Sequence, residues 1–151
     1  MKEFEEQFSE LQADMISICM EYVEDRADKV YIYASCEESV ISGRFFYQIN
    51  NKYVKCHKVN EALKEGDARY DVSPKRMFEV LHIIGDDIEK IKVLCEEHGR
   101  DMPTEMKLIY DVKSGNFKAE YKYELIYFND DVKTAGDIAD EWFEEVKSNN
   151  L

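Results

Sequence analysis

In the stretch 116–128, apolar and charged residues take turns along the chain. The apolar set is Phe117, Ala119, Tyr121 and Tyr123, and the charged set is Lys118, Glu120, Lys122 and Glu124. A period of two is typical of a β-strand with one face on a core and the other in water. The segment 105–112 alternates more loosely, and Gly115 and Asn116 between the two can adopt positive φ. We therefore predict a β-hairpin whose tyrosine face packs against helices.

Three other stretches have the spacing of amphipathic helices. Apolar residues at steps of three and four predict helices over 3–24, 73–98 and 134–148. Ser73-Pro74 is a typical helix start, and Thr134 with Asp137 resembles a capping pair. Gly85 interrupts the second helix at a cost of about 1 kcal/mol relative to alanine, which leaves open a kink or two helices meeting there.

The remaining apolar stretches predict three further strands, over 29–35, 40–49 and 52–59, because they are rich in β-branched and aromatic residues. Their connections are too short for parallel crossovers, so the strands should form an antiparallel meander. The order is α-β-β-β-α-β-β-α. We expect an α+β fold in one domain, 1–151, with a single antiparallel sheet of about five strands and the helices packed on one face.

The charge balance restricts the classes of partner. Twenty basic and 33 acidic residues give a net charge of −13, which repels nucleic acid and anionic lipid and suits a basic partner, or serves solubility alone. No run approaches the roughly 18 apolar residues of a membrane span. The acidic start of the chain lacks the pattern of a secretory signal, so we expect a cytoplasmic protein.

Four cysteines raise the question of a metal site. They occur at 19, 36, 56 and 95, form no Cys-x-x-Cys pair, and should be reduced in the cytosol. Cys95 with His98 and Cys56 with His57 could supply a zinc set of two cysteines and two histidines. The spacing matches no common zinc module, and Cys95 continues an apolar stripe. We therefore expect no metal and no cofactor.

Catalytic motifs are also missing from the sequence. The paired acids Asp86-Asp87 and Glu96-Glu97 point in different directions on a helix, which favours a solvated helix face. No Gly-x-Ser-x-Gly elbow and no phosphate-binding glycine loop is present. Cys36 stands next to Glu37 and Glu38, which should raise the pKa of its thiol and weaken it as a nucleophile. We predict a binding protein that is not an enzyme.

Three collinear features carry a family resemblance over about residues 25–130. They are the strand Val30-Tyr31-Ile32-Tyr33-Ala34 after an N-terminal helix, the strand Gly43-Arg44-Phe45-Phe46-Tyr47 after a short polar turn, and Pro103-Thr104 followed by Asp111, Gly115, Phe117 and Tyr121-Lys122-Tyr123-Glu124. Together they resemble the YezG-like immunity proteins, or antitoxins, of bacterial polymorphic toxin systems. The resemblance implies a cytosolic protein that binds and blocks the toxic domain of a secreted effector, often a nuclease.

A basic toxin domain would be steered by an acidic surface of the inhibitor. The candidate contacts are Glu37 and Glu38 in the first hairpin turn, and Asp137, Asp140, Glu141 and Glu144 on the outer face of the last helix. One alternative is a small-molecule or regulatory binding module with a pocket between sheet and helices near the tyrosines. Another is a hydrolase that uses clustered carboxylates and a divalent ion. We expect a monomer or a weak homodimer formed through an exposed edge strand.

Overall fold

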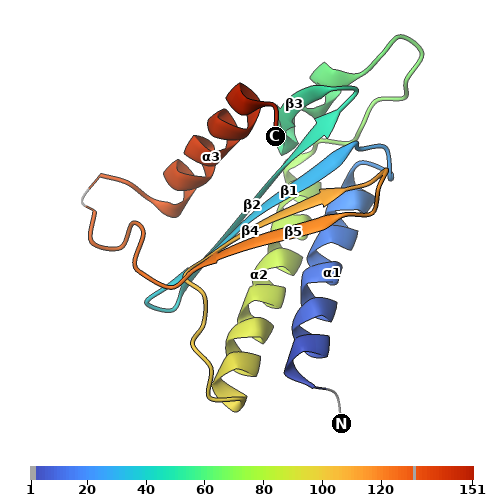
Figure 1. Ribbon diagram of the computed structural model, residues 1–151. Helices are drawn as coiled ribbons and strands as arrows, with labels where there is room; N and C mark the ends of the chain where they lie inside the picture. Colours follow the sequence, from blue (N-terminus) through green and yellow to red (C-terminus); the bar gives the residue numbers. More distant parts are fainter. Residues whose placement is uncertain (1–2, 131) are drawn as a thin grey trace.

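A five-stranded antiparallel sheet runs through the middle of the molecule, with helices on both of its faces (Figure 1). The computed structural model describes residues 3–130 and 132–151. The strand order is β3-β2-β1-β4-β5, with β1 at Lys29–Glu37, β2 at Val40–Ile49, β3 at Lys52–Lys55, β4 at Glu105–Asp111 and β5 at Phe117–Lys122. The helices are α1 (Phe4–Tyr22), the 3₁₀ helix η1 (Cys56–Ala62), α2 (Pro74–Glu97) and α3 (Ala135–Asn149). The predicted fold class is confirmed.

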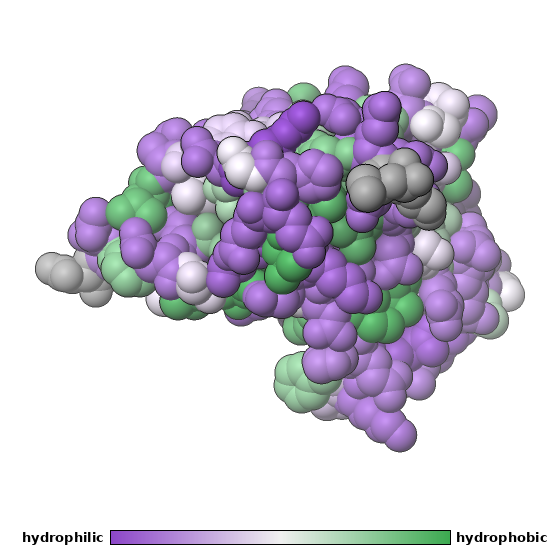
Figure 2. Space-filling view, turned by 90° about the horizontal axis from the view of Figure 1, so that it is seen from below, coloured by the Kyte–Doolittle hydropathy of each residue, from purple (hydrophilic) through white to green (hydrophobic). Residues whose placement is uncertain are grey.

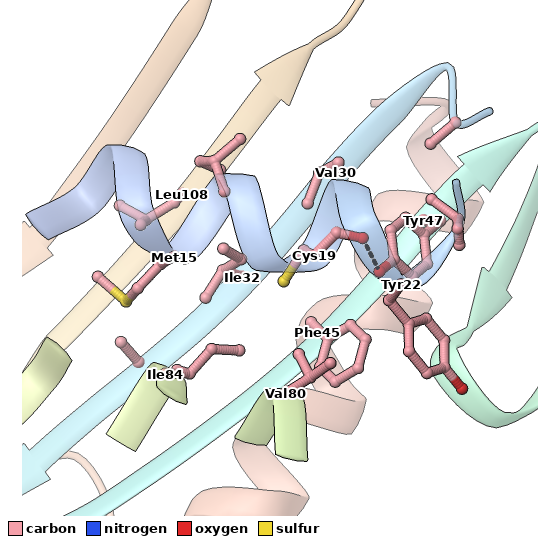
Figure 3. Packing of buried hydrophobic residues seen from close by; sticks show 14 of the residues in the cluster. Met15, Cys19, Tyr22, Val30, Ile32, Phe45, Tyr47, Val80, Ile84 and Leu108 are labelled. Atoms are coloured by element: carbon pink, nitrogen blue, oxygen red, sulfur yellow. Dashed lines mark hydrogen bonds between the residues drawn. The ribbon is translucent and has the colours of Figure 1, made fainter. Parts of the chain in front are cut away.

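The larger core lies between the sheet and the pair α1 and α2. Figure 3 shows Met15, Cys19 and Tyr22 of α1 among side chains of the strands and of α2. The buried strand residues of this face are Val30, Ile32, Ala34, Cys36, Phe45, Tyr47, Ile49, Val54, Met106 and Leu108. The buried hydroxyl of Tyr47 donates a hydrogen bond to the carbonyl oxygen of Cys19, which fastens α1 to the centre of the sheet (Figure 3).

The smaller core lies on the opposite face and holds α3. Tyr31 and Tyr33 of β1 and Phe46 of β2 are buried there against Trp142 and Phe143, and Figure 1 shows α3 across the sheet from α1 and α2. Our expectation that all helices share one face is therefore wrong for α3. The physical reason is that β1 is apolar at successive positions, so both of its faces need a cover.

The β4–β5 hairpin turns its tyrosine face toward α1, as predicted. The hydroxyl of Tyr121 accepts a hydrogen bond from Nε2 of Gln12 (2.8 Å), and the rings of Phe8 and Tyr121 meet edge to face. β5 ends at Lys122, earlier than predicted, where Thr104 donates hydrogen bonds to the carbonyl oxygens of Lys122 and Glu124. The strand predicted over 52–59 is also shorter than expected. β3 ends at Lys55, because the next residues form the 3₁₀ helix η1.

Two glycines near α2 should respond oppositely to alanine. The helix runs without interruption through Gly85, where an added Cβ meets nothing within 4 Å, so Gly85→Ala should stabilise the fold by about 1 kcal/mol. A Cβ on Gly43 of β2 would lie 2.6 Å from Cγ2 of Ile84, so Gly43→Ala should destabilise by about 1–3 kcal/mol. Thermal unfolding of both variants measures the difference. If the two substitutions changed the stability equally, the close packing of Ile84 against Gly43 would not limit the side chain at this position.

Candidate binding surface

Helix α3 begins at a complete capping box. The backbone N–H of Asp137 donates to Oγ1 of Thr134 (3.3 Å), and the N–H of Thr134 donates to Oδ2 of Asp137 (2.9 Å). The predicted capping pair is confirmed. The carboxylate of Asp137 therefore stabilises the start of its own helix, which makes it less available to a partner than the other exposed acids.

An aromatic cluster fixes α3 on the sheet. The ring of Phe46 lies 5.1 Å from that of Trp142 and 5.0 Å from that of Phe143, both in edge-to-face geometry, and it stacks on Tyr31 at 4.7 Å. The exposed side chains lie on the opposite side of the helix. Because the helix is anchored by large buried rings, its outer carboxylates are presented at fixed positions.

The outer face of α3 carries the remaining predicted acids of the last helix, all of them exposed. Asp140 forms an ion pair with Lys55 of β3 (3.0 Å), and Glu141 forms one with Lys133 (2.7 Å). Glu144 makes no ion pair within residues 3–130 and 132–151. Exposed pairs of this kind contribute only about 0–1 kcal/mol, so a cationic partner could displace either lysine at little cost.

Glu37 is not a surface residue, and our prediction of it as a contact is wrong. Its side chain is fully buried at the end of β1. Its Oε1 accepts hydrogen bonds from the backbone N–H groups of Ile126 (2.9 Å), Tyr127 (3.2 Å) and Phe128 (3.1 Å). The carboxylate thus satisfies a segment of irregular backbone that lacks strand partners of its own. Glu38, the next residue, is exposed in the β1–β2 turn.

The β1–β2 hairpin lies beside the start of α3. An open hollow of about 490 Å³ is lined by Val40 and Arg44 of β2 and by Phe128, Lys133 and Gly136. Figure 2 views the molecule from the end that is lower in Figure 1, and hydrophilic residues cover most of that surface. Because the same hollow is lined by Val40, close to the turn that carries Glu38, and by Gly136 in the first turn of α3, these two turns lie in one region of the surface. A joint binding surface requires this arrangement.

The cysteines and histidines of the zinc alternative are spread along the molecule. Sγ of Cys56 lies 3.9 Å from Sδ of Met77, near the start of α2. Cys95 comes eighteen residues after Met77, which is about 27 Å along the helix. Within the described ranges, no group of three or more histidine, cysteine or acidic residues could hold a metal ion.

The thiols are poor nucleophiles at neutral pH. Burial raises the pKa of Cys56 to about 11 and raises the pKa of Cys36 as well. The direction expected for Cys36 is confirmed, but the main cause is burial against α2, where Lys92 opposes the rise and Glu89 adds to it. Neither thiol has the low pKa of a catalytic cysteine.

One acid of the predicted solvated helix face is buried. Asp87 is only 2% exposed, whereas Asp86, Glu96 and Glu97 are exposed as expected. The pKa of Asp87 is raised to about 7, chiefly by burial and also by the hydrogen bond to the carboxyl group of Asp14 on α1 and by the charge of that group. The helical period of α2 could not reveal that Asp87 is buried, because the residue is covered by another helix, α1.

A second candidate site is a groove of about 940 Å³ between α1 and the β4–β5 hairpin. Its apolar wall is formed by Ala13, Ile16, Met20, Tyr110, Val112 and Phe117. At one end lie Glu21, Glu24 and Asp25, with Arg76, whose guanidinium donates to the carbonyl oxygens of Glu21 (2.9 Å) and Tyr22 (3.3 Å). The groove is the kind of pocket that a small-molecule or regulatory module would need.

Comparison with known proteins found no matching family model and no matching curated relative. Among the described residues, no helix is long and apolar enough to cross a membrane. The surfaces of this chain and the resemblance of its sequence motifs are therefore the observations that bear on its function.

Proposed function

We propose that this protein is an immunity protein that binds and neutralises the toxic domain of a cognate secreted bacterial toxin, and that it acts by binding rather than by catalysis. The observation that carries the proposal is the outer face of α3, where Asp140, Glu141 and Glu144 are exposed on a helix held by buried aromatic rings. The resemblance to YezG-like immunity proteins supplies the class of partner. The net charge of −13 favours a basic one.

The physics of such an inhibitor is straightforward. A nuclease domain is basic where it holds phosphate, so an acidic surface accelerates association and selects that cleft over acidic surfaces. The carboxylates on α3 are preorganised, so little conformational entropy is lost on binding. Lys55 and Lys133 neutralise two of the acids in the free protein and can give way to lysine or arginine side chains of the toxin.

Co-expression tests the proposal directly. The partner to use is the C-terminal toxin domain of a large open reading frame next to the gene, if one is encoded there. Recovery of growth together with a stable 1:1 complex supports neutralisation by binding. A toxin that remains fully active in the presence of the folded protein contradicts it.

Charge reversal on α3 locates the contact. The double variant Asp140→Lys/Glu144→Lys should weaken toxin binding at least about tenfold, mainly through slower association at low salt. The matched control is Glu96→Lys/Glu97→Lys at the end of α2, because both pairs are exposed and both changes shift the net charge by +4. Surface plasmon resonance measures both rate constants. Equal weakening by the two double variants would mean that only total charge matters, and not the face of α3.

The groove beside α1 favours a second candidate, a small-molecule or regulatory binding module without catalysis. Its apolar wall and acidic end suit an amphiphilic ligand with a cationic group. The toxin experiment distinguishes the two candidates, since a module of this kind would leave the toxin active and form no complex with it.

A further inference from the structure

The outer edge of β5 is open. It is the last strand of the sheet and, within the described ranges, it pairs only with β4. The N–H of Asp111 donates to the carbonyl oxygen of Asn116 (2.9 Å), so the backbone groups of the even-numbered β5 residues point toward β4. Those of Phe117, Ala119 and Tyr121 therefore point outward. An edge of this kind is a template for pairing with another chain.

A second copy of the chain fits this edge in very few registers. Two β5 strands related by a two-fold axis perpendicular to the sheet run antiparallel, and residues of the same face must oppose each other. An axis through Ala119 pairs 117–121 with 121–117 of the copy, and an axis through Glu120 pairs 118–122 with 122–118. Axes further along the strand pair shorter stretches.

Charge selects between these two axes. The axis through Glu120 sets Glu120 against itself and Lys118 against Lys122 of the copy, which are like charges. The axis through Ala119 sets Lys118 against Glu120 of the copy. By symmetry it also sets Glu120 against Lys118 of the copy, so two pairs of opposite charge form. Opposite charges across an antiparallel pair stabilise it, and like charges destabilise it.

The apolar face agrees with the same axis. Phe117 and Tyr121 are 43% and 38% exposed in the single chain, on the side that faces α1. The axis through Ala119 places Phe117 opposite Tyr121 of the copy, so each aromatic side chain gains a cover. The small side chain of Ala119 lies on the axis itself. All the outward-pointing backbone groups of Phe117, Ala119 and Tyr121 then find partners.

We propose that the chain forms a two-fold symmetric dimer through β5, with Ala119 on the axis, so that one sheet continues into the other. The net charge of −13 on each copy opposes association at long range, and moderate salt reduces that repulsion. The dimer is independent of the proposed function, because it uses the sheet edge and leaves the outer face of α3 uncovered.

A charge-swap series tests the register. Sedimentation equilibrium of the full chain over about 5–500 µM, in about 0.3 M NaCl, gives the dimer dissociation constant for wild type, Lys118→Glu, Glu120→Lys and the double variant. Each single change creates two like-charge pairs and should weaken the dimer about tenfold. The double variant exchanges the two signs and should return to within about threefold of wild type. Thermal unfolding of each variant confirms that the monomer is folded, since Glu120 also opposes Lys107 within the chain.

The Glu120→Lys variant separates this register from a mere effect of total charge. It makes the net charge less negative, −11 instead of −13, so a dimer limited only by repulsion would become stronger, whereas the proposed dimer becomes weaker. A wild-type protein that stays monomeric over the whole range overturns the proposal. So does a dimer that the single changes leave intact, or one that the double change does not restore.

Discussion

Replacing Glu37 with alanine is expected to lower the free energy of unfolding by about 3–5 kcal/mol, because three backbone N–H groups lose their acceptor at once. The groups belong to Ile126, Tyr127 and Phe128, and the Tyr127 side chain is itself buried, with its hydroxyl 3.1 Å from Oγ of Ser35. Glu37→Gln keeps one acceptor oxygen and should lose less, about 1–2 kcal/mol. Urea unfolding followed by far-UV circular dichroism measures both losses.

The adjacent acid provides the control. Glu38 is exposed in the turn, so Glu38→Ala should change stability by no more than about 0.5 kcal/mol. Trp142 is the single tryptophan of the chain and lies on the buried side of α3 against the sheet, so its fluorescence reports whether α3 leaves the sheet with the 126–128 segment. If Glu37→Ala were as mild as Glu38→Ala, other contacts would hold this segment in place.

Much of the architecture could be predicted from local signals. Ser73 accepts a hydrogen bond from the N–H of Arg76 and Pro74 opens α2, as their positions predict, and the outer face of α3 follows from its helical period. The need for a cover on both faces of the sheet was also encoded locally, although not which helix lies on which face. The run Val30–Ala34 does not alternate, which is typical of a strand buried on both faces and calls for a helix on each side.

The candidate site was predictable only where its geometry is local. The exposed acids of α3 follow from one helix, but Glu37 depends on N–H groups 89 to 91 residues away and Asp140 on a lysine 85 residues away. Two neighbouring glutamates in a turn give no sign that one of them points inward. The groove beside α1 likewise arises because α1 and α2 leave part of β4 and β5 uncovered, and no single element encodes that.

Asp87 should make stability fall as the pH rises through neutrality. Burial raises its pKa to about 7 in the folded protein, helped by Asp14 and Asp86 and opposed by Lys90. Its pKa in the unfolded chain is about 3.9, so the folded state alone holds this proton between about pH 4 and pH 7. The resulting stabilisation is complete below about pH 4 and is lost as the pH rises through about 7, where two carboxylates then repel each other between α1 and α2.

The variant Asp87→Asn removes this titration while its amide can still donate to Asp14. At pH 8 it should be more stable than wild type by about 2–4 kcal/mol, and the difference should shrink toward pH 4. Urea unfolding at several pH values measures it. Asp86→Asn is the control for loss of a neighbouring charge and should have a much smaller effect, because Asp86 is exposed, lies 3.4 Å from His82 and contributes least among the causes of the raised pKa of Asp87. A difference that stays constant from pH 4 to pH 8 would show that Asp87 does not bind a proton on folding. A lower stability of Asp87→Asn at pH 8 would mean that its carboxylate is held by favourable contacts between the helices.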